Sequence, residues 1–285
     1  MAKGKLTLRK APLYAMFIAL LFCLFALARC QSVYDAARRT DAPSGAQAVP
    51  VLMYHHLLRE AENTRYRGNS IVTTVEAFTA QLQWLKDNGY ETISLAALEA
   101  FLYNNGPLPP KPVMITFDDG YLSNALYAAP ILREAGFTAV VFPVTGKLSQ
   151  QPETFRPDQI NMLDPSAMRQ AGDVFEYASH THNLHRTAGN GRSALTDAAA
   201  ADIQDDLSKS LAVIADLPTG STRAFSYPYG FTNDKVKQAL RENGVRMAFR
   251  ASAGRLTRDS DPYALPRYAV SEAVDMAQFR KFFGA

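Results

Sequence analysis

The stretch Thr116-Phe117-Asp118-Asp119-Gly120 follows directly on the apolar run Val113-Met114-Ile115. The run predicts a buried strand, which then ends in adjacent carboxylates and a glycine. Such carboxylates are costly to bury unless a metal ion or a reacting proton requires them, and their charges push the two pKa values apart. One division of labour binds one carboxylate to a metal and uses the other as a base. The alternative is a polar strand end with Asp119-Gly120 in an ordinary turn.

Strands and helices alternate along the rest of the chain. We expect strands at residues 49–54, 91–94, 113–117, 137–144, 174–178, 224–227, 246–249 and 265–270. Between them we expect helices at residues 74–88, 96–103, 121–135, 166–170, 196–215, 233–243 and 274–283, and a long loop at 146–163. This alternation predicts an α/β fold with a parallel sheet, as a distorted (β/α) barrel of about seven or eight strands. Polar clusters follow several strands, at the face where barrels build active sites.

Three histidines, His180, His182 and His185, follow the strand predicted at residues 174–178. The strand ends at the same edge of the predicted sheet as the paired carboxylates. Imidazole and carboxylate together suit Zn, Fe, Co or Ni and leave coordination positions open for water and substrate. The ordinary alternative for a histidine in a loop is solvated surface, and His182 can point away from the other two.

A third polar cluster is Arg223-Ala224-Phe225-Ser226-Tyr227-Pro228-Tyr229-Gly230. An arginine beside a carboxylate lowers the pKa of that carboxylate and fixes its orientation. Aromatic groups at a strand end can form a wall for a sugar ring. Taken alone, the segment is typical of an ordinary strand followed by a turn.

The composition is that of an ordinary globular protein, with 285 residues, 47% apolar and 20% charged. No basic stripe interleaved with aromatic residues indicates nucleic-acid binding. Both cysteines, Cys23 and Cys30, lie in or just after the N-terminal apolar stretch. The remainder of the chain therefore has neither disulfides nor a thiolate metal site.

Residues 1–30 have the layout of a secretory signal, in which basic residues precede the uncharged run 11–28. That run is just long enough for a transmembrane helix. Leu27-Ala28-Arg29-Cys30 resembles a lipoprotein signal with Cys30 as the lipidated residue, although Arg29 replaces the expected small residue. Lipoprotein, uncleaved signal anchor and plain secretion stay open, and all three predict an extracytoplasmic location in the cell envelope. Residues 31–48 predict a linker, and 49–285 the folded domain.

Together the three clusters resemble the carbohydrate esterase family 4 polysaccharide deacetylases, the NodB-homology domain. Residues 116–120 match the first motif of that family, His180-Thr181 with His185 the second, and residues 223–230 the third, in family order. The resemblance implies metal-dependent N-deacetylation of an N-acetylglucosamine polysaccharide with release of acetate. It also implies one divalent metal ion, with Zn as the family default and Fe, Co or Ni as options.

The resemblance also implies roles for the metal-site residues. In the family the first Asp of the motif is the catalytic base and the second a metal ligand, which implies Asp118 as base and Asp119, His180 and His185 as ligands. The five-residue spacing between the two histidines is similar to that of the poly-β-1,6-N-acetylglucosamine deacetylases of biofilm matrix synthesis. The opening at residues 49–55 looks like the same subgroup.

No histidine follows His185, so the usual late Leu-His motif of the family is absent. In the subgroup an N-terminal strand supplies the general acid, which implies His55, with His56 facing the opposite side of its strand. The arginine that orients the base is either Arg223 or Arg267. The resemblance implies that Tyr227, Pro228 and Tyr229 contact the substrate or stabilise the oxyanion, Tyr229 through its backbone N–H.

Two alternatives accompany this interpretation. One is a peptidoglycan or chitin-type deacetylase with the same chemistry, and the other a catalytically silent carbohydrate-binding protein of the envelope. The implied partners are the polysaccharide, the membrane through the N-terminal segment, and polysaccharide synthesis or export machinery, with no nucleic acid.

Overall fold

The computed structural model describes residues 48–285 except Asn190. The predicted signal or anchor segment, nearly all of the linker, and Cys30 lie outside the described residues. Among the helices in the described part of the chain, none combines the length and the apolar character needed to cross a membrane.

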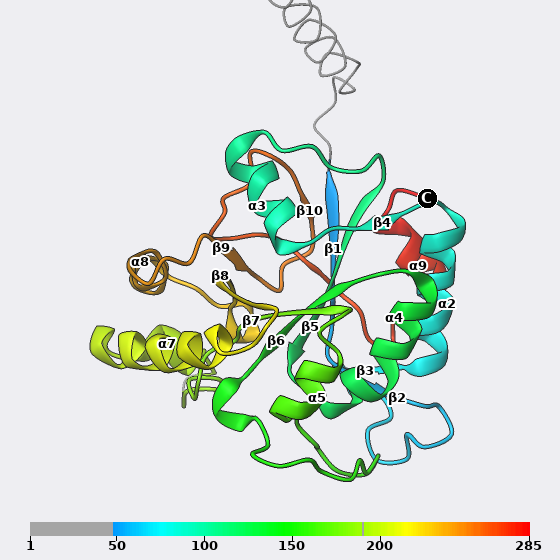
Figure 1. Cartoon of the computed structure of the whole chain (residues 1–285), viewed down its shortest axis with the longest axis horizontal. Helices are drawn as coiled ribbons and strands as arrows, with labels where there is room; N and C mark the ends of the chain where they lie inside the picture. The colour runs from blue at the N-terminus through cyan, green and yellow to red at the C-terminus, as the bar shows by residue number, and fades with distance from the viewer. Residues whose placement is uncertain (1–47, 190) are drawn as a thin grey trace, which may run out of the picture. The chain divides into compact units, whose positions relative to one another are not determined.

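A curled and mostly parallel sheet lies between the helices (Figure 1). Its main strands, in spatial order, are β1 (Val49–Tyr54), β5 (Pro112–Asp119), β6 (Ala139–Pro143), β7 (Phe175–Ser179), β8 (Gly220–Ser226) and β9 (Met247–Phe249). The short strands β4 (Glu91–Thr92) and β11 (Tyr268–Ala269) run parallel to β5 and β1, and β10 (Arg255–Leu256) runs antiparallel to β1.

The last part of the chain links the two ends of this strand series. Leu265 forms a parallel bridge with Phe249 of β9, and a few residues later β11 pairs with β1. The segment therefore connects β9 to β1, and the sheet curls as a distorted (β/α) barrel does. The predicted fold class is confirmed.

Strand β5 is buried on both faces, as its continuous apolar run predicts. Ile115 and Phe117 pack into one core cluster with residues of the outer helices, whereas Met114 packs into another with Val140 and Phe249. Successive side chains of a strand point to opposite faces, so the two clusters lie on the two sides of the sheet. The strand that carries the carboxylates is thus fixed from both sides.

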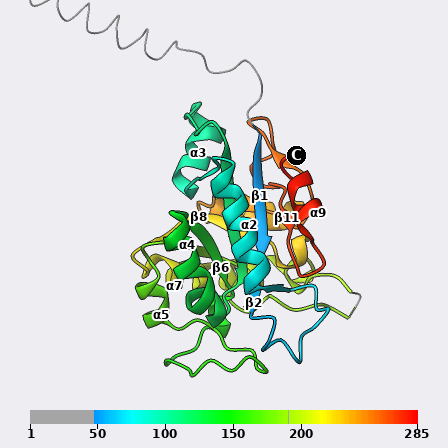
Figure 2. The same cartoon turned by 90° about the vertical axis from the view of Figure 1, so that its right-hand side faces the viewer.

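Helices cover the strands on both flanks. Figure 1 shows α2, α4 and α9 on one flank and α7 and α8 on the other. Tyr54 at the end of β1 donates a hydrogen bond of 2.7 Å to Gln81, which holds α2 alongside β1 (Figure 2). The helices are α2 (Val75–Asp87), α3 (Leu95–Asn104), α4 (Ala129–Ala135), α5 (Pro165–Gln170), α6 (Ala194–Asp197), α7 (Ala200–Ala215), α8 (Asp234–Glu242) and α9 (Met276–Lys281).

Two predicted helices are interrupted. The helix predicted at 121–135 is instead a π-helix, η1 (Asn124–Ala128), followed by α4. Pro130 explains the wide turn, because it has no N–H to donate to Leu126 and its ring crowds the preceding turn. The helix predicted at 196–215 breaks at extended residues between α6 and α7.

The remaining differences concern short elements. The 3₁₀ turns η2 (Thr145–Lys147) and η3 (Pro228–Gly230) lie in segments predicted as loop or turn. A small parallel sheet of β2 (His56–Leu58) and β3 (Val72–Thr74) was not predicted. The predicted strand 265–270 narrows to β11, because Pro266 cannot donate a ladder hydrogen bond.

Candidate active site

The carboxyl ends of four strands meet at one edge of the sheet. His55 follows β1, Asp118 and Asp119 end β5, His180 follows β7, and Ser226 ends β8. The strands are parallel, with Asp118 beside Phe142 of β6, and a shift of register after Tyr177 puts Ser179 of β7 beside Phe225 of β8. Segments far apart in sequence therefore deliver polar side chains to the same place.

Asp118 forms a buried, bidentate ion pair with Arg267. The two Nη–Oδ distances are 2.7 and 2.6 Å, and neither residue is more than 3% exposed. Arg267 also donates to Thr116 Oγ1 at 3.1 Å and to Ser226 Oγ at 2.8 Å. The hydroxyl of Ser226 in turn donates to Asp118 Oδ2 at 3.1 Å. The orientation of the carboxylate is thus fixed by two buried neighbours, Arg267 and Ser226, and Arg267 is itself held by Thr116.

This arrangement keeps Asp118 ionised. Burial by itself raises the pKa of the carboxyl, but the charge of Arg267 and the hydrogen bonds that it donates outweigh this effect. The net result is an Asp118 pKa well below its usual range, so the group is a carboxylate at neutral pH. A carboxylate in this state can accept a proton from a water molecule that a metal ion has made more acidic.

Arg223, the other arginine considered from sequence, lies outside the site. Its guanidinium is exposed and pairs with Glu99 of α3, with an Nε–Oε2 distance of 2.7 Å. Arg223 belongs to the exposed part of β8, before the strand becomes buried at Ala224. Of the two arginines, only Arg267 contacts Asp118.

Asp119, His180 and His185 form a compact cluster of potential metal ligands, with all ligand atoms within 4.8 Å of one another. Asp119 Oδ1 lies 3.1 Å from His185 Nε2 and 3.7 Å from His180 Nε2. Two imidazoles and one carboxylate are a donor set that divalent transition metals accept, with positions left for water and substrate.

The surroundings of these three residues fit a metal ion. His180 Nδ1 lies 2.7 Å from the carbonyl oxygen of Ser226 and donates to it, so that Nε2 keeps its lone pair. Tyr121 donates to Asp119 Oδ2 at 3.0 Å. Asp119 Oδ1 is buried and accepts no hydrogen bond from any residue that the structure describes. A buried carboxylate oxygen without a donor, facing two imidazole nitrogens, has the partner it lacks in a cation.

The pKa values of the neighbouring groups support the same interpretation. Burial lowers the pKa of His185 to about 4, with the nearby His180 adding to the effect and Asp119 opposing it. His185 is therefore neutral at pH 7, as a metal ligand must be. Burial, followed by the charge of Asp119, raises the pKa of Tyr121, which therefore keeps the proton that it donates to Asp119.

The turns that carry the site are held in unusual backbone conformations. Asp119, Thr181 and Tyr229 adopt positive φ values of 69°, 74° and 58° although none is glycine. Gly120 has φ +85°, and a Cβ there would lie 2.7 Å from Pro143 Cβ, so the position excludes any other residue. Non-glycine residues in this region cost about 1–3 kcal/mol each and cluster at functional sites.

His55, His56 and His182 occupy three different environments. Burial lowers the pKa of His55, while the charges of Asp118 and Asp119 raise it, which shows that this imidazole lies in the field of both carboxylates. His56 faces away, with Nδ1 2.8 Å from Ser123 Oγ and its ring 4.9 Å from that of Tyr121.

His182 does not belong to the metal cluster. Its Nδ1 lies 3.0 Å from Thr145 Oγ1 instead.

The aromatic residues of the third polar cluster, residues 223–230, also occupy different environments. Tyr227 is buried and donates to the carbonyl of Tyr263 at 3.0 Å, whereas Tyr229 is 44% exposed with its ring 4.8 Å from that of His185. Only Tyr229 forms a wall beside the metal cluster, next to the buried Pro228.

Sequence reasoning gave no role to three groups that build the site, namely Thr116, Tyr121 and Ser226. All three lie within or beside the quoted motifs, but their side-chain partners come from distant parts of the chain. The alternation of side chains along β8 could have indicated Ser226. It puts Ser226 on the same face of the strand as Ala224, which packs in the core cluster that contains Met114.

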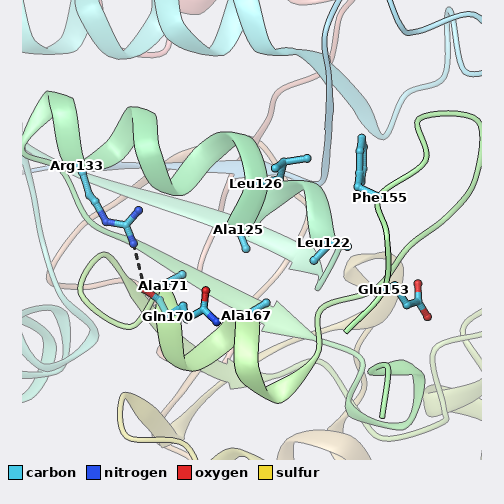
Figure 3. A pocket seen from close by; sticks show the side chains of 9 residues that line it. All are labelled: Leu122, Ala125, Leu126, Arg133, Glu153, Phe155, Ala167, Gln170 and Ala171. Carbon is cyan, nitrogen blue, oxygen red and sulfur yellow. Dashed lines mark hydrogen bonds between the residues drawn. The ribbon is translucent and has the colours of Figure 1, made fainter. Parts of the chain in front are cut away.

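A separate cavity of about 440 Å³ lies between η1, α4 and α5 (Figure 3). Leu122, Ala125, Leu126 and Phe155 make its lining largely apolar. Arg133 at its edge is engaged by Asp173 and by the carbonyl of Gln170. None of the candidate metal ligands lines this cavity, so it is distinct from the site.

Known proteins resemble the part of the chain that carries Asp119, His180 and His185. A family model described as polysaccharide deacetylase matches residues 105–248. A poly-β-1,6-N-acetyl-D-glucosamine N-deacetylase of Staphylococcus aureus is 31% identical over 200 residues. The aligned region covers 68% of this chain and 66% of that protein, just under two thirds of its length.

Solved structures show the same fold. A deacetylase of Streptococcus pyogenes, PplD, solved in complex with acetate, has a TM-score of 0.72 at 21% identity and covers 85% of this chain and 100% of its own. IcaB from Ammonifex degensii has a TM-score of 0.71 at 23% identity, with 85% and 98% covered. At these identities the likeness concerns the fold.

The buried His56 gives the chain a specific sensitivity to acid. Burial lowers the pKa of His56 to about 4, whereas an unfolded histidine titrates near 6.5. The unfolded state therefore takes up this proton first as pH falls, and stability is lost between pH 6.5 and 4. Between pH 7.5 and 5, His56 alone should account for a loss of about 2 kcal/mol in the free energy of unfolding.

Urea unfolding of the wild type and of His56→Gln at both pH values measures this loss. The variant should lose about 2 kcal/mol less than the wild type over the same interval, because the other histidines titrate in both proteins. Equal losses in the two proteins would show that His56 is not kept neutral by the fold.

Proposed function

The chain belongs to the polysaccharide deacetylase family, and from this premise we propose that it is a metal-dependent hydrolase that removes acetyl groups from an N-acetylglucosamine polysaccharide. The proposal rests on two features that lie side by side at one edge of the sheet. Asp118 is held ionised by Arg267, and immediately beside it Asp119 faces His180 and His185. A base next to a Lewis-acid site is what amide hydrolysis requires.

Asp119, His180 and His185 would hold one divalent ion. When bound, such an ion polarises the amide carbonyl and lowers the pKa of a water molecule. Zn²⁺ suits the donor set, and Fe, Co and Ni ions accept the same ligands.

The chain's own residues then have separate tasks in the reaction. Asp118 takes a proton from the water that attacks the acetyl carbon. The backbone N–H of Tyr229 donates to the carbonyl oxygen as that oxygen becomes negative. The C–N bond breaks when the nitrogen receives a proton, and we assign its delivery to His55, which follows β1 at the sheet edge where β5 ends in Asp118 and Asp119. The products are acetate and a glucosamine unit.

For the substrate we propose poly-β-1,6-N-acetyl-D-glucosamine. The support is the Staphylococcus aureus relative that bears this activity in its name, together with the five-residue spacing from His180 to His185. The exposed ring of Tyr229 beside the metal cluster gives a sugar ring an apolar face to pack against.

The first test is acetate release from β-1,6-linked N-acetylglucosamine oligomers, with β-1,4-linked oligomers as the comparison. Activity should favour the β-1,6 oligomer, fall at least about 100-fold after chelation, and return with Zn²⁺ or Co²⁺. Preference for the β-1,4 oligomer would favour a peptidoglycan or chitin-type substrate. Metal-bound, folded protein that is inactive on both would support a silent carbohydrate-binding protein.

The second test is Asp118→Asn, which should lower the rate of acetate release by about 10²–10⁴-fold, because an amide cannot accept the proton from water. Arg223→Gln is the matched control, since Arg223 is exposed and lies outside the site. The substitution at Asp118 also leaves the buried Arg267 charge without its partner, so circular dichroism must show that the variant is folded. A folded Asp118→Asn with wild-type activity would contradict the assignment.

We also propose that the chain acts outside the cytoplasm, anchored to the membrane through residues 1–30. The support is the sequence alone, where basic residues precede an uncharged run that ends near Cys30. Full-length chain should be found in the membrane fraction of a bacterial host, and Cys30→Ser should prevent lipid labelling if the anchor is a lipid. Recovery of the unprocessed chain in the cytoplasmic fraction would contradict this location.

A further inference from the structure

The turn between the two candidate ligand histidines is held by a carboxylate from a distant helix. Asp206 of α7 is 5% exposed. It accepts hydrogen bonds from the backbone N–H groups of His182, Asn183 and Leu184, at 2.8, 2.6 and 2.9 Å. These three N–H groups belong to the four residues that separate His180 from His185.

The same turn is held from its other side by the segment after β6. Thr145 N–H donates to the carbonyl of Thr181 at 3.0 Å, and Gly146 N–H donates to that of His182 at 2.9 Å. A Cβ at Gly146 would lie 2.5 Å from the His182 carbonyl oxygen and 2.2 Å from Asn183 Oδ1. The turn is therefore enclosed between a glycine backbone and a buried carboxylate.

Asp206 is itself firmly placed. Leu207, the next residue on α7, is fully buried in a core cluster with Ile203 and Leu211. One turn further along α7, Ser210 Oγ lies 2.7 Å from Ser179 Oγ, at the end of the strand that precedes His180. The helix thus contacts both the strand and the turn of the histidine segment.

Asp206 forms no ion pair with a Lys or Arg residue of the part of the chain that the structure describes, since no nitrogen of these residues lies within 4.0 Å of its carboxylate. Its carboxylate accepts hydrogen bonds from the three N–H groups of the turn, and hydrogen bonds to an ionised acceptor are about twice as strong as neutral ones. Such bonds can hold Thr181 at its positive φ of 74°.

We propose that Asp206 is a positioning residue of the metal site. It acts through the turn, by fixing the backbone of residues 182–184 so that the Nε2 atoms of His180 and His185 face Asp119. Asp206 itself is not one of the candidate metal ligands. This inference rests on the proposed metal-dependent function, and it adds that metal affinity depends on a residue that does not bind the metal.

The variant Asp206→Asn tests the proposal, because it replaces one accepting oxygen with an NH₂ group that cannot accept from the turn. Metal affinity should fall about 10–100-fold, as for outer partners of metal ligands. Asp205→Asn is the matched control, since Asp205 is the preceding residue, its side chain is 63% exposed, and it pairs with Lys209 at the surface of α7. Asp205→Asn should bind metal as the wild type does.

The measurement is titration of the full-length apoprotein with Co²⁺, followed by its d–d absorption bands, and with Zn²⁺ in competition with a chelator. We expect weaker binding and altered Co²⁺ bands for Asp206→Asn, while urea unfolding of the apoprotein shows that the variant is folded. If Asp206→Asn does not fold, Asp206→Glu replaces it. The longer carboxylate keeps the charge but misplaces its oxygens, and we expect the same direction of change.

Two results would overturn the inference in different ways. If the folded variant keeps wild-type affinity and an unchanged Co²⁺ spectrum, Asp206 has no positioning role, and the proposed function stands. If the wild type binds neither metal ion, the metal-dependent function and the inference both fail.

Discussion

The buried ion pair of Asp118 and Arg267 is the interaction on which the site depends. It joins residues 149 positions apart and connects the end of β5 to the segment that links β9 with β1. Two charges in an apolar interior are tolerated only when they are paired and hydrogen-bonded. Here Thr116 and Ser226 complete the hydrogen bonding, and removing one charge of such a pair costs about 3–5 kcal/mol. The geometry of the candidate site and the closure of the sheet between β9 and β1 are therefore stabilised by the same contact.

This pair also explains how two adjacent aspartates acquire different properties. Asp118 remains part of the ladder of β5 and points at Arg267. Asp119 turns into the left-handed region, at φ 69°, and faces His180 and His185 instead. The backbone reversal is possible because Gly120 follows, at φ +85° and against Pro143. The chemistry of the motif comes from this difference in environment, since the two side chains are identical.

The local features of the fold were predictable because local physics decides them. Thr74 and Asn233 cap α2 and α8 at the first residues of the helices predicted at 74–88 and 233–243, and the apolar run before Asp118 is a strand buried on both faces. The strand–helix alternation gave the fold class for the same reason. Pro130 could have predicted the wide turn of η1, but the apolar spacing around it is that of a continuous helix.

What sequence reasoning could not settle depends on long-range contacts. Nothing in the local sequence separates Arg267 from Arg223, because only the closure of the sheet brings Arg267 to Asp118 and leaves Arg223 beside Glu99. Asp206 looks like any acidic residue of an amphipathic helix until the position of the turn that it holds is known.

The most direct test of the separate roles of Asp118 and Asp119 compares metal content in Asp119→Asn and Asp118→Asn. The account predicts about one bound Zn²⁺ in folded Asp118→Asn and none in folded Asp119→Asn. Equal metal content in the two variants would contradict the division of labour between the two carboxylates.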